Sequence, residues 1–328
     1  MITRRKLVAA TGACALTPLG AFAQQPSPKV WRIGFIHLGS LPTSGQRLEA
    51  LRAGLRDLGY VEGKNLVIES RWGDGKIERI PQLVAELVQL KPDVIVGSSL
   101  VIQVLKQATS SIPIVIASIG DPVAAGLVSS LARPGGNITG MSIMSTELSA
   151  KWLQFALELV PGASRIGLLL QSPASTATRV MLEQLQAAAQ KLKIGFIIPP
   201  VKEAADLPGA FAQFKRERAQ AMIVQITPVN LDQRALITQM AAQQRLVAVY
   251  EGADFADAGA LLSYGANLNA MSRRAAIFAD KILKGAKPGD LPVEQPSQFE
   301  LVLNLKTAKA LGIKIPGAIV LQATRVIE

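Results

Sequence analysis

The residues best placed to hold a small polar molecule are hydroxyl and carboxylate side chains that follow short apolar runs. They occur at four places: Gly39 to Ser44, Ser98-Ser99, Gly120-Asp121 and Ser172 through Thr176. Each place combines a capping side chain with the unpaired backbone N–H groups that open a helix, which suits a ligand carboxylate without a committed arginine. For any single one of these residues, a role in capping its own helix is as good an explanation as contact with a ligand. Four such places at strand ends together favour a polar or zwitterionic ligand.

A ligand ammonium group would need carboxylates or carbonyls. Asp121, Glu251 and Asp254 are candidates, with helix capping the competing role for Asp121. Tyr250 and Tyr264 end predicted strands and offer a ring face or a phenol hydrogen bond, with core packing as the alternative for both. The full set of predicted ligand-binding residues is His37, Gly39, Ser40, Ser98, Ser99, Asp121, Gln171, Ser172, Ser175, Thr176, Thr227, Tyr250, Glu251 and Tyr264.

Few residues are available for catalysis or metal binding. The only histidine, His37, ends the first predicted strand, and we interpret it as a packing residue or a ligand hydrogen-bonding group rather than a general base. The chain has no Gly-Lys-Ser/Thr phosphate loop and no Gly-x-Ser-x-Gly elbow. We therefore predict no catalytic residue, no metal ion and no cofactor. Paired carboxylates keep open the alternative of a secreted α/β enzyme or a ligand sensor that acts on a small polar molecule.

The amino terminus has the pattern of an export signal. A positive start at Arg4-Arg5-Lys6 precedes a short apolar segment, Leu7 to Leu16, and small residues at Ala21-Phe22-Ala23. The apolar segment has roughly half of the ~20 residues that a bilayer span needs. We predict a signal peptide over residues 1–23 and a periplasmic location, and the sequence leaves the Sec and twin-arginine routes open.

Charge and cysteine content limit the partners further. Three positive charges of the formal net charge of +11 lie in the predicted signal peptide, which leaves +8, and these cations are scattered rather than gathered in a basic patch. We therefore predict no nucleic-acid partner. The only cysteine, Cys14, lies within the signal; its lipidation is the alternative there, and Thr11 fits a lipidation signal poorly. Residues 24–328 contain no thiol and no disulfide.

The elements that position the candidate residues alternate between strands and helices in two series. Apolar, β-branched runs predict buried parallel strands, and apolar residues at helical spacing predict the helices between them. Strands are predicted at residues 30–37, 65–71, 93–97, 112–118 and 138–143, and then at 165–170, 194–198, 221–226 and 246–250. Because such strands are joined by right-handed crossovers, we predict the α/β class with two Rossmann-like lobes, each built on a parallel sheet.

The segment that joins the two series defines the end of the first lobe. Asp121 and Pro122 are suited to start a helix over residues 124–133, which Gly135-Gly136 would end before the last strand. The tail is predicted to contain a strand at 260–265, a helix at 270–284 and another strand from 299. This order suits a chain that returns to the first lobe and then goes back to the second.

These patterns predict three crossings between the lobes and define the domain boundaries. Hinges are expected near residues 143–145, 264–265 and 296–297. The predicted domains are the signal peptide at 1–23, lobe 1 at 30–144 plus 265–296, and lobe 2 at 145–264 plus 297–328.

Several longer motifs resemble the substrate-binding proteins of ABC transporters of the tryptophan/tyrosine type. The motifs are Leu55 to Asn65, Gly120 to Val123, Leu131 to Gly140, Leu262 to Gly265, Lys281 to Pro288 and Phe299 to Ala308. The resemblance covers nearly the whole chain after the signal. It implies a type I periplasmic binding fold, in which two lobes close on a small ligand and present it to a membrane ABC permease.

The resemblance implies an amino acid or related carboxylate as the ligand, with an aromatic amino acid possible. Family members often carry Asn-Pro or Asn-Ser after the first strand of the second lobe, where this chain has Gln171 to Thr176. This difference leaves the identity of the amino acid open. A sugar-responsive repressor shares the lobe architecture, but it would need a DNA-binding helix-turn-helix where this chain has its export signal.

Overall fold

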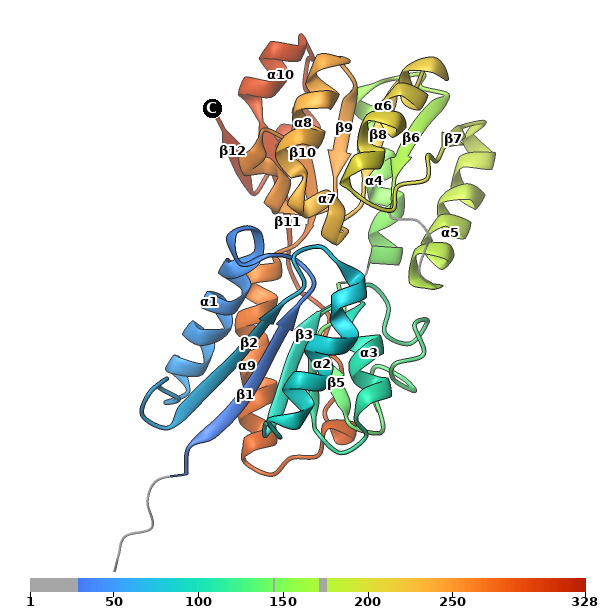
Figure 1. Ribbon diagram of the computed structural model, residues 1–328. Helices are drawn as coiled ribbons and strands as arrows, with labels where there is room; N and C mark the ends of the chain where they lie inside the picture. Colours follow the sequence, from blue (N-terminus) through green and yellow to red (C-terminus); the bar gives the residue numbers. More distant parts are fainter. Residues whose placement is uncertain (1–28, 99, 144, 171–175) are drawn as a thin grey trace, which may run out of the picture.

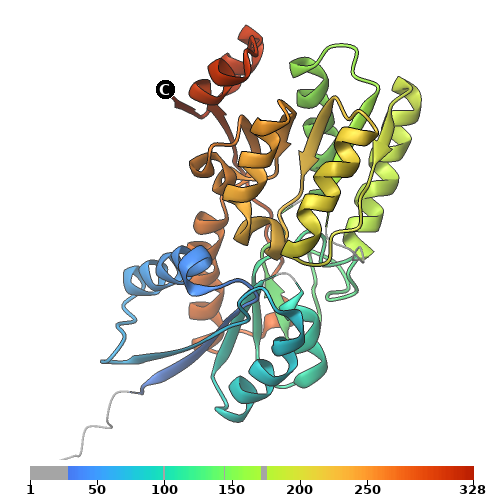
Figure 2. The same ribbon diagram turned by 45° about the horizontal axis from the view of Figure 1, so that its top comes forward.

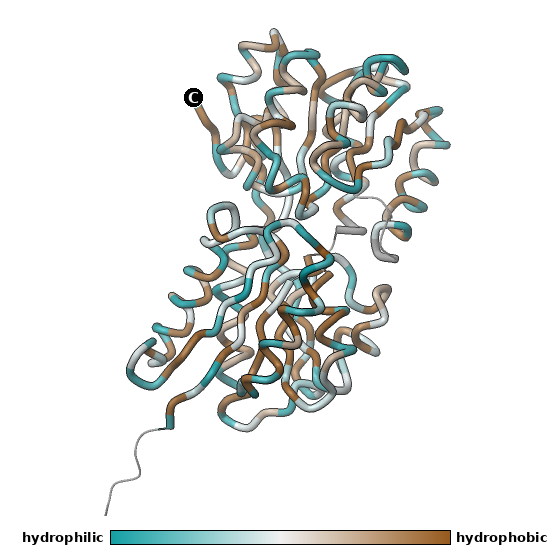
Figure 3. The backbone as a smooth tube through the Cα atoms, viewed as in Figure 1, coloured by the Kyte–Doolittle hydropathy of each residue, from teal (hydrophilic) through white to brown (hydrophobic). Residues whose placement is uncertain are grey.

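The structure is a computed structural model that describes residues 29–98, 100–143, 145–170 and 176–328. The predicted signal peptide, Ser99, Gln171, Ser172 and Ser175 lie outside the described residues. The chain forms two α/β lobes that are stacked end to end (Figure 1). Apolar residues concentrate along the central strands and polar residues on the outer turns of the helices (Figure 3). Among the described helices, none combines the length and apolar character that a membrane span requires.

Lobe 1 contains a five-stranded parallel sheet in the order β2-β1-β3-β4-β5. The strands are β1 (Trp31–His37), β2 (Leu66–Trp72), β3 (Val94–Ser98), β4 (Ile114–Ser118) and β5 (Ile138–Gly140). The helices are α1 (Leu41–Asp57), α2 (Ile80–Gln89), α3 (Val101–Ala108) and α9 (Leu268–Leu283). Apolar residues of α1 and α9 share one core with the sheet, and those of α2 and α3 share a second core on its other face. On the face shared by α1 and α9, a hydrogen bond of 2.8 Å from Tyr60 Oη to Asp280 Oδ1 joins the segment after α1 to α9.

Lobe 2 contains a seven-stranded sheet in the order β12-β11-β10-β9-β8-β6-β7. The strands are β6 (Arg165–Leu169), β7 (Gly195–Ile197), β8 (Ala221–Val224), β9 (Val247–Tyr250), β10 (Leu262–Ala266), β11 (Phe299–Asn304) and β12 (Arg325–Ile327). The helices are α4 (Ser145–Leu159), α5 (Thr176–Leu192), α6 (Leu207–Arg216), α7 (Pro228–Asp232), α8 (Arg234–Gln243), α10 (Leu305–Leu311) and α11 (Gly317–Gln322). Residues of α4 and α5 pack on one face of this sheet, and residues of α6 and α8 pack on the other.

The predicted fold class of two α/β lobes is confirmed, with one refinement in lobe 2. Strand β11 runs antiparallel to β10, with Tyr264 opposite Leu301. Because β12 pairs in parallel with β11, these two strands run opposite to the rest of the sheet. The chain enters β11 directly from lobe 1, beside the end of β10, rather than after a helix within the same lobe. The chain crosses between the sheets after β5, after β10 and before β11 (Figure 2).

The second crossing lies slightly later than the expected hinge at residues 264–265. Strand β10 continues to Ala266, and Asn267 caps α9 by accepting a hydrogen bond of 2.8 Å from the backbone N–H of Ala270. The Asn267 side chain also donates to Glu300 Oε1 at 2.6 Å, which links the second crossing to β11. The first and third crossings are linked as well, because the backbone N–H of Ser142 donates to the carbonyl of Glu294 at 2.9 Å.

The prediction of a helix over residues 124–133 is wrong. The segment forms a series of turns, although Asp121 caps its start as predicted by accepting bonds of 2.9 Å from the backbone N–H groups of Val123 and Ala124. The helix does not continue because Gly126 adopts a left-handed conformation, with φ +66°. An α-helix needs negative φ at every position, so it ends after a single turn.

Candidate ligand-binding site

The carboxyl ends of the two sheets face each other between the lobes (Figures 1 and 2). On the lobe 1 side these ends include His37 of β1 and Ser98 of β3, and on the lobe 2 side they include Val224 of β8 and Tyr250 of β9. The lobes touch here, because Ile226, just after β8, packs against the cores of both lobes. Ligands of open parallel sheets bind at such ends, so this region is the candidate site.

His37 is the best-defined polar group at the lobe 1 edge. Its ring packs beside Trp72, with ring centroids 5.9 Å apart, and its Nδ1 accepts a hydrogen bond of 3.0 Å from the backbone N–H of Gly39. A side chain at position 39 would lie 3.1 Å from Nδ1 and 2.6 Å from Ser44 Oγ, so the close approach favours glycine. Burial, and next the positive charge of Arg47, lower the pKa of His37 to about 4, with Asp254 opposing. The imidazole is therefore neutral at physiological pH.

Lowering the pH is expected to destabilise the folded protein through His37. The pKa of this group is about 4 in the folded protein, against 6.5 for an unperturbed histidine. Between these values the unfolded chain binds the proton and the folded protein does not, so the free energy of unfolding falls as the pH decreases through this window. Relative to the His37→Asn variant, which cannot titrate here, we expect the wild type to lose about 1–3 kcal/mol between pH 7 and about pH 4.5. Urea unfolding of both proteins measures this difference; equal losses would contradict the expectation.

The other predicted residues of lobe 1 lie at the same edge. Ser40 precedes α1, and its hydroxyl is 2.8 Å from that of Thr43. Ser98 is buried at the end of β3, and Asp121 is occupied by capping the turn after β4. The structure therefore brings His37, Gly39 and Ser40 together, while their contact with a ligand stays a prediction.

The predicted residues of lobe 2 are more deeply buried. Thr227 is buried and caps α7 by accepting a bond of 3.1 Å from the backbone N–H of Asn230. Glu251 is also buried and accepts a bond of 2.9 Å from the backbone N–H of Ile226. These two side chains hold the loops that follow β8 and β9 in place.

The two tyrosines proposed as ring or phenol contacts have packing roles. Tyr250 belongs to a core cluster of lobe 2, where its ring centroid lies 5.0 Å from that of Phe255. Tyr264 is half-buried and packs between Phe155 and Phe299. Burial raises the pKa of both phenols, so both stay protonated. Thr176 begins α5, and its side chain lies outside what the structure describes.

Two contacts between the lobes were not predicted, and one of them uses Asp254, which the sequence had indicated as a candidate for a ligand ammonium group. Thr43 Oγ1 donates to Asp232 Oδ1 of lobe 2 at 2.6 Å, and Arg47 forms an ion pair of 2.5 Å with Asp254 Oδ1 in the short 3-10 helix after β9. Arg47 also donates to Asn269 Oδ1 at the start of α9. Burial raises the pKa of Asp232, and the Thr43 hydrogen bond opposes this rise.

The sequence contained a signal for Arg47. It lies four residues before Leu51 and eight before Leu55, on the buried face of α1. An arginine on an apolar helix face needs an anionic partner. Its partner is 207 residues away in the chain, which is why sequence spacing alone did not identify it.

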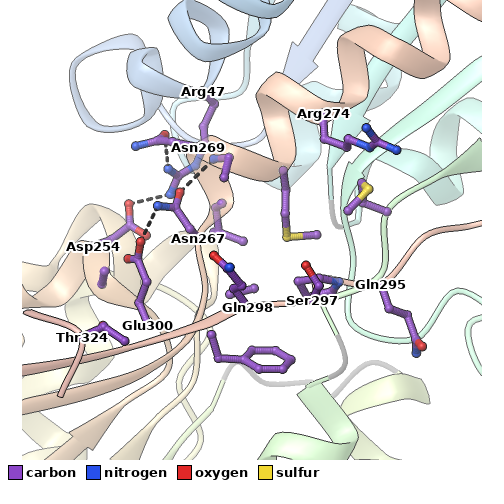
Figure 4. Close-up of a pocket in the computed structure, with 18 of the residues that line it drawn as sticks. Arg47, Asp254, Asn267, Asn269, Arg274, Gln295, Ser297, Gln298, Glu300 and Thr324 are labelled. Atoms are coloured by element: carbon purple, nitrogen blue, oxygen red, sulfur yellow. Dashed lines mark hydrogen bonds and ion pairs between the residues drawn. The ribbon is translucent and has the colours of Figure 1, made fainter. Parts of the chain in front are cut away.

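A cavity of about 1380 Å³ adjoins this contact, beside the second and third crossings (Figure 4). Arg47 and Asp254 line it. Asp254 was a candidate partner for a ligand ammonium group, but no described residue of the full predicted ligand-binding set lines the cavity. Ion pairs along its lining join Arg47 to Asp254, Arg274 to Glu294 and Arg325 to Asp257, while Glu300 accepts a hydrogen bond from Asn267. The described lining therefore carries three cationic and four anionic side chains, a formal net charge of −1. Within the described parts of the chain, no three His, Cys, Asp or Glu side chains are placed to hold a metal ion.

Two α/β lobes with facing strand ends and three connections define a bilobal binding protein of the type I periplasmic class. The family model of ABC transporter substrate-binding proteins matches residues 33–327, so the chain belongs to this family. The family predicted from the sequence motifs is confirmed.

Individual relatives agree with this assignment. A tyrosine-binding protein of Clostridioides difficile (strain R20291) is 24% identical over 290 residues, covering 88% of this chain and 83% of that protein. A conserved domain protein of Vibrio cholerae has a similar solved structure, with a TM-score of 0.84, 27% identity, and coverage of 91% of this chain and 100% of that chain. An ABC domain from Streptococcus pneumonia in complex with L-Trp gives a TM-score of 0.82 and 24% identity, with the same coverage.

Proposed function

We propose that this substrate-binding protein captures an amino acid between its two lobes and delivers it to the membrane permease of an ABC transporter. L-Tyrosine and L-tryptophan are the favoured ligands. A relative named as tyrosine-binding and a similar structure that contains L-Trp support this class. The observation that carries the proposal is the meeting of the two sets of strand ends, where a neutral imidazole and the hydroxyl groups of Ser40 and Thr43 lie at the lobe 1 edge.

The proposed location and mode of action follow from the family and the leader. Residues 1–23 are proposed to direct export to the periplasm, where the permease would receive the loaded protein. The family is one of solute-binding proteins, which supports a role in binding rather than in catalysis.

The proposed mechanism is closure of two bodies, with residues 30–144 plus 265–296 in lobe 1 and 145–264 plus 297–328 in lobe 2. A ligand that contacts both lobes stabilises the closed form by its differential affinity for that form. The Thr43–Asp232 and Arg47–Asp254 contacts join the lobes and would contribute to the same closed form.

A thermal-shift screen tests the ligand class. L-Tyrosine or L-tryptophan at about 100 times its dissociation constant should stabilise the folded protein by about 2.7 kcal/mol. For a chain of about 300 residues, whose unfolding entropy is about 2.1 cal/mol/K per residue, that corresponds to an increase in Tm of roughly 4 °C. Small organic acids, sugars and the remaining amino acids serve as the comparison set. A response to sugars alone would contradict the amino acid proposal while leaving the binding architecture intact, and turnover of a screened compound would support an enzyme.

A further inference from the structure

His37 has one ring nitrogen occupied and one without a partner. Nδ1 accepts the hydrogen bond from Gly39, and an acceptor nitrogen carries no proton. In the neutral imidazole the proton must then be on Nε2. No hydrogen-bond partner of Nε2 occurs within the part of the chain that the structure describes. The protein therefore presents a fixed N–H donor at the carboxyl end of β1.

The surroundings of the ring hold this donor in one orientation. Phe35 stacks parallel to the imidazole, with centroids 6.4 Å apart and an interplanar angle of 5°, and Trp72 packs against it at 50°. The Cα of Gly39 fits against the Nδ1 edge, where a side chain would clash. A donor fixed by packing on three sides loses little conformational entropy when it binds.

The charges around the ring favour an anionic acceptor. Arg47 of α1 and Asp254 of lobe 2 are the charged groups that act on His37, and the effect of Arg47 is the larger of the two. The Arg47 cation therefore contributes a positive potential at the imidazole, which the Asp254 carboxylate partly offsets. A carboxylate oxygen is stabilised there more than a neutral oxygen is, because a positive potential lowers the energy of negative charge.

We propose that His37 donates its Nε2–H to the carboxylate of the bound amino acid, and so selects amino acids over the corresponding amines. This assignment rests on the proposed function. It gives the sole histidine a binding role that needs no change of protonation, and it assigns the recognition of a ligand anion to a neutral donor while Arg47 remains paired with Asp254.

Nitrogen NMR tests, without mutation, whether His37 carries its proton on Nε2 and whether this group contacts the bound amino acid. Because the chain has a single histidine, a long-range ¹H–¹⁵N spectrum of the ¹⁵N-labelled protein contains one imidazole spin system. We expect the Nε2–H tautomer at neutral pH, and a shift of the Nε2 signal when saturating L-tyrosine or L-tryptophan is added. An Nδ1–H tautomer, or an imidazole unchanged by an amino acid that binds, would overturn the assignment.

Paired ligands and paired variants test whether His37 selects amino acids over the corresponding amines. In the His37→Asn variant, the shorter amide can still accept from Gly39 but cannot reach the Nε2 position; in His37→Gln, the amide nitrogen can. We expect His37→Asn to weaken L-tyrosine binding by about tenfold or more and tyramine binding by less than about twofold, with His37→Gln recovering part of the loss. L-Tryptophan and tryptamine form a second pair. Calorimetric titration measures all of these affinities.

The outcomes separate this inference from the proposed function. If an amino acid binds the wild type and His37→Asn with equal affinity, or if the variant weakens the acid and the amine equally, the His37 assignment is wrong while the function stands. If no amino acid binds the wild type, both are wrong. A selective loss for the acid, together with the tautomer and the shift, supports both.

Discussion

The Arg47→Ala variant is expected to bind its amino acid ligand at least tenfold more weakly than the wild type. Arg47 is 8% exposed and connects α1 to Asp254 of lobe 2, so its removal deletes a contact between the lobes and leaves a partly buried carboxylate without its cation. A charge-assisted hydrogen bond contributes about 1.5–3 kcal/mol. If that free energy stabilises the closed form, its loss lowers the population competent to bind and weakens the apparent affinity by the same factor.

Arg52→Ala is the matched control for this experiment. Arg52 lies on the same helix and also forms ion pairs, but its partners Glu49 and Glu62 both belong to lobe 1. Its side chain is 30% exposed, so the pairs are screened by solvent. Calorimetric titration of both variants should show a large effect for Arg47→Ala and almost none for Arg52→Ala. Similar affinities for the two variants would show that the Arg47–Asp254 pair has no role in closure.

The Gly140→Ala variant is expected to lose about 4 kcal/mol or more of stability, which is the range of severe backbone or packing damage. Gly140 ends β5 with φ +132°, and a Cβ there would lie 2.2 Å from the carbonyl oxygen of Ile116 in the neighbouring strand. Backbone atoms within a sheet cannot move aside as a flexible side chain would. The site also supports the crossings, since the carbonyl of Gly140 accepts from the backbone N–H of Glu294 at 2.8 Å.

The Gly136→Ala variant is a control that separates the clash with Ile116 from the cost of placing an alanine at positive φ. Gly136 also has positive φ, +64°, but a Cβ there would meet no atom within 4 Å. Its replacement should cost only about 1–2 kcal/mol for the left-handed backbone. Thermal and urea unfolding followed by tryptophan fluorescence compare the two variants. Equal losses would mean that the contact with Ile116 does not determine the effect at Gly140.

The sequence was sufficient to predict the lobes because the strands are fully buried. A strand covered by helices on both faces must be apolar along its length, and Val94 to Val96 and Ile114 to Ile116 are all at most 1% exposed. The same logic gave the position of His37, since a polar residue after such a run lies at the strand end. The parallel order followed from the helices between the strands.

The features that the sequence did not predict correctly depend on contacts between distant residues or on backbone conformation. The helix over 124–133 was lost to a left-handed Gly126, and a composition compatible with a helix does not reveal that choice. Tyr250 was placed correctly at a strand end, but alternation cannot show which face of the sheet its ring would join. The Arg47–Asp254 contact depends on the placement of one lobe against the other, which local patterns do not specify.

The distance between the two lobes, measured with and without ligand, tests the central claim most directly. Residues 24–328 contain no cysteine, so Lys64→Cys and Lys191→Cys place spin labels at one exposed site in each lobe. Pulsed electron resonance should show that saturating L-tyrosine or L-tryptophan shifts the distance distribution toward a single closed population, and that Arg47→Ala reduces this population at limiting ligand. An amino acid that binds by calorimetry but leaves the distribution unchanged would contradict capture by closure of the two lobes.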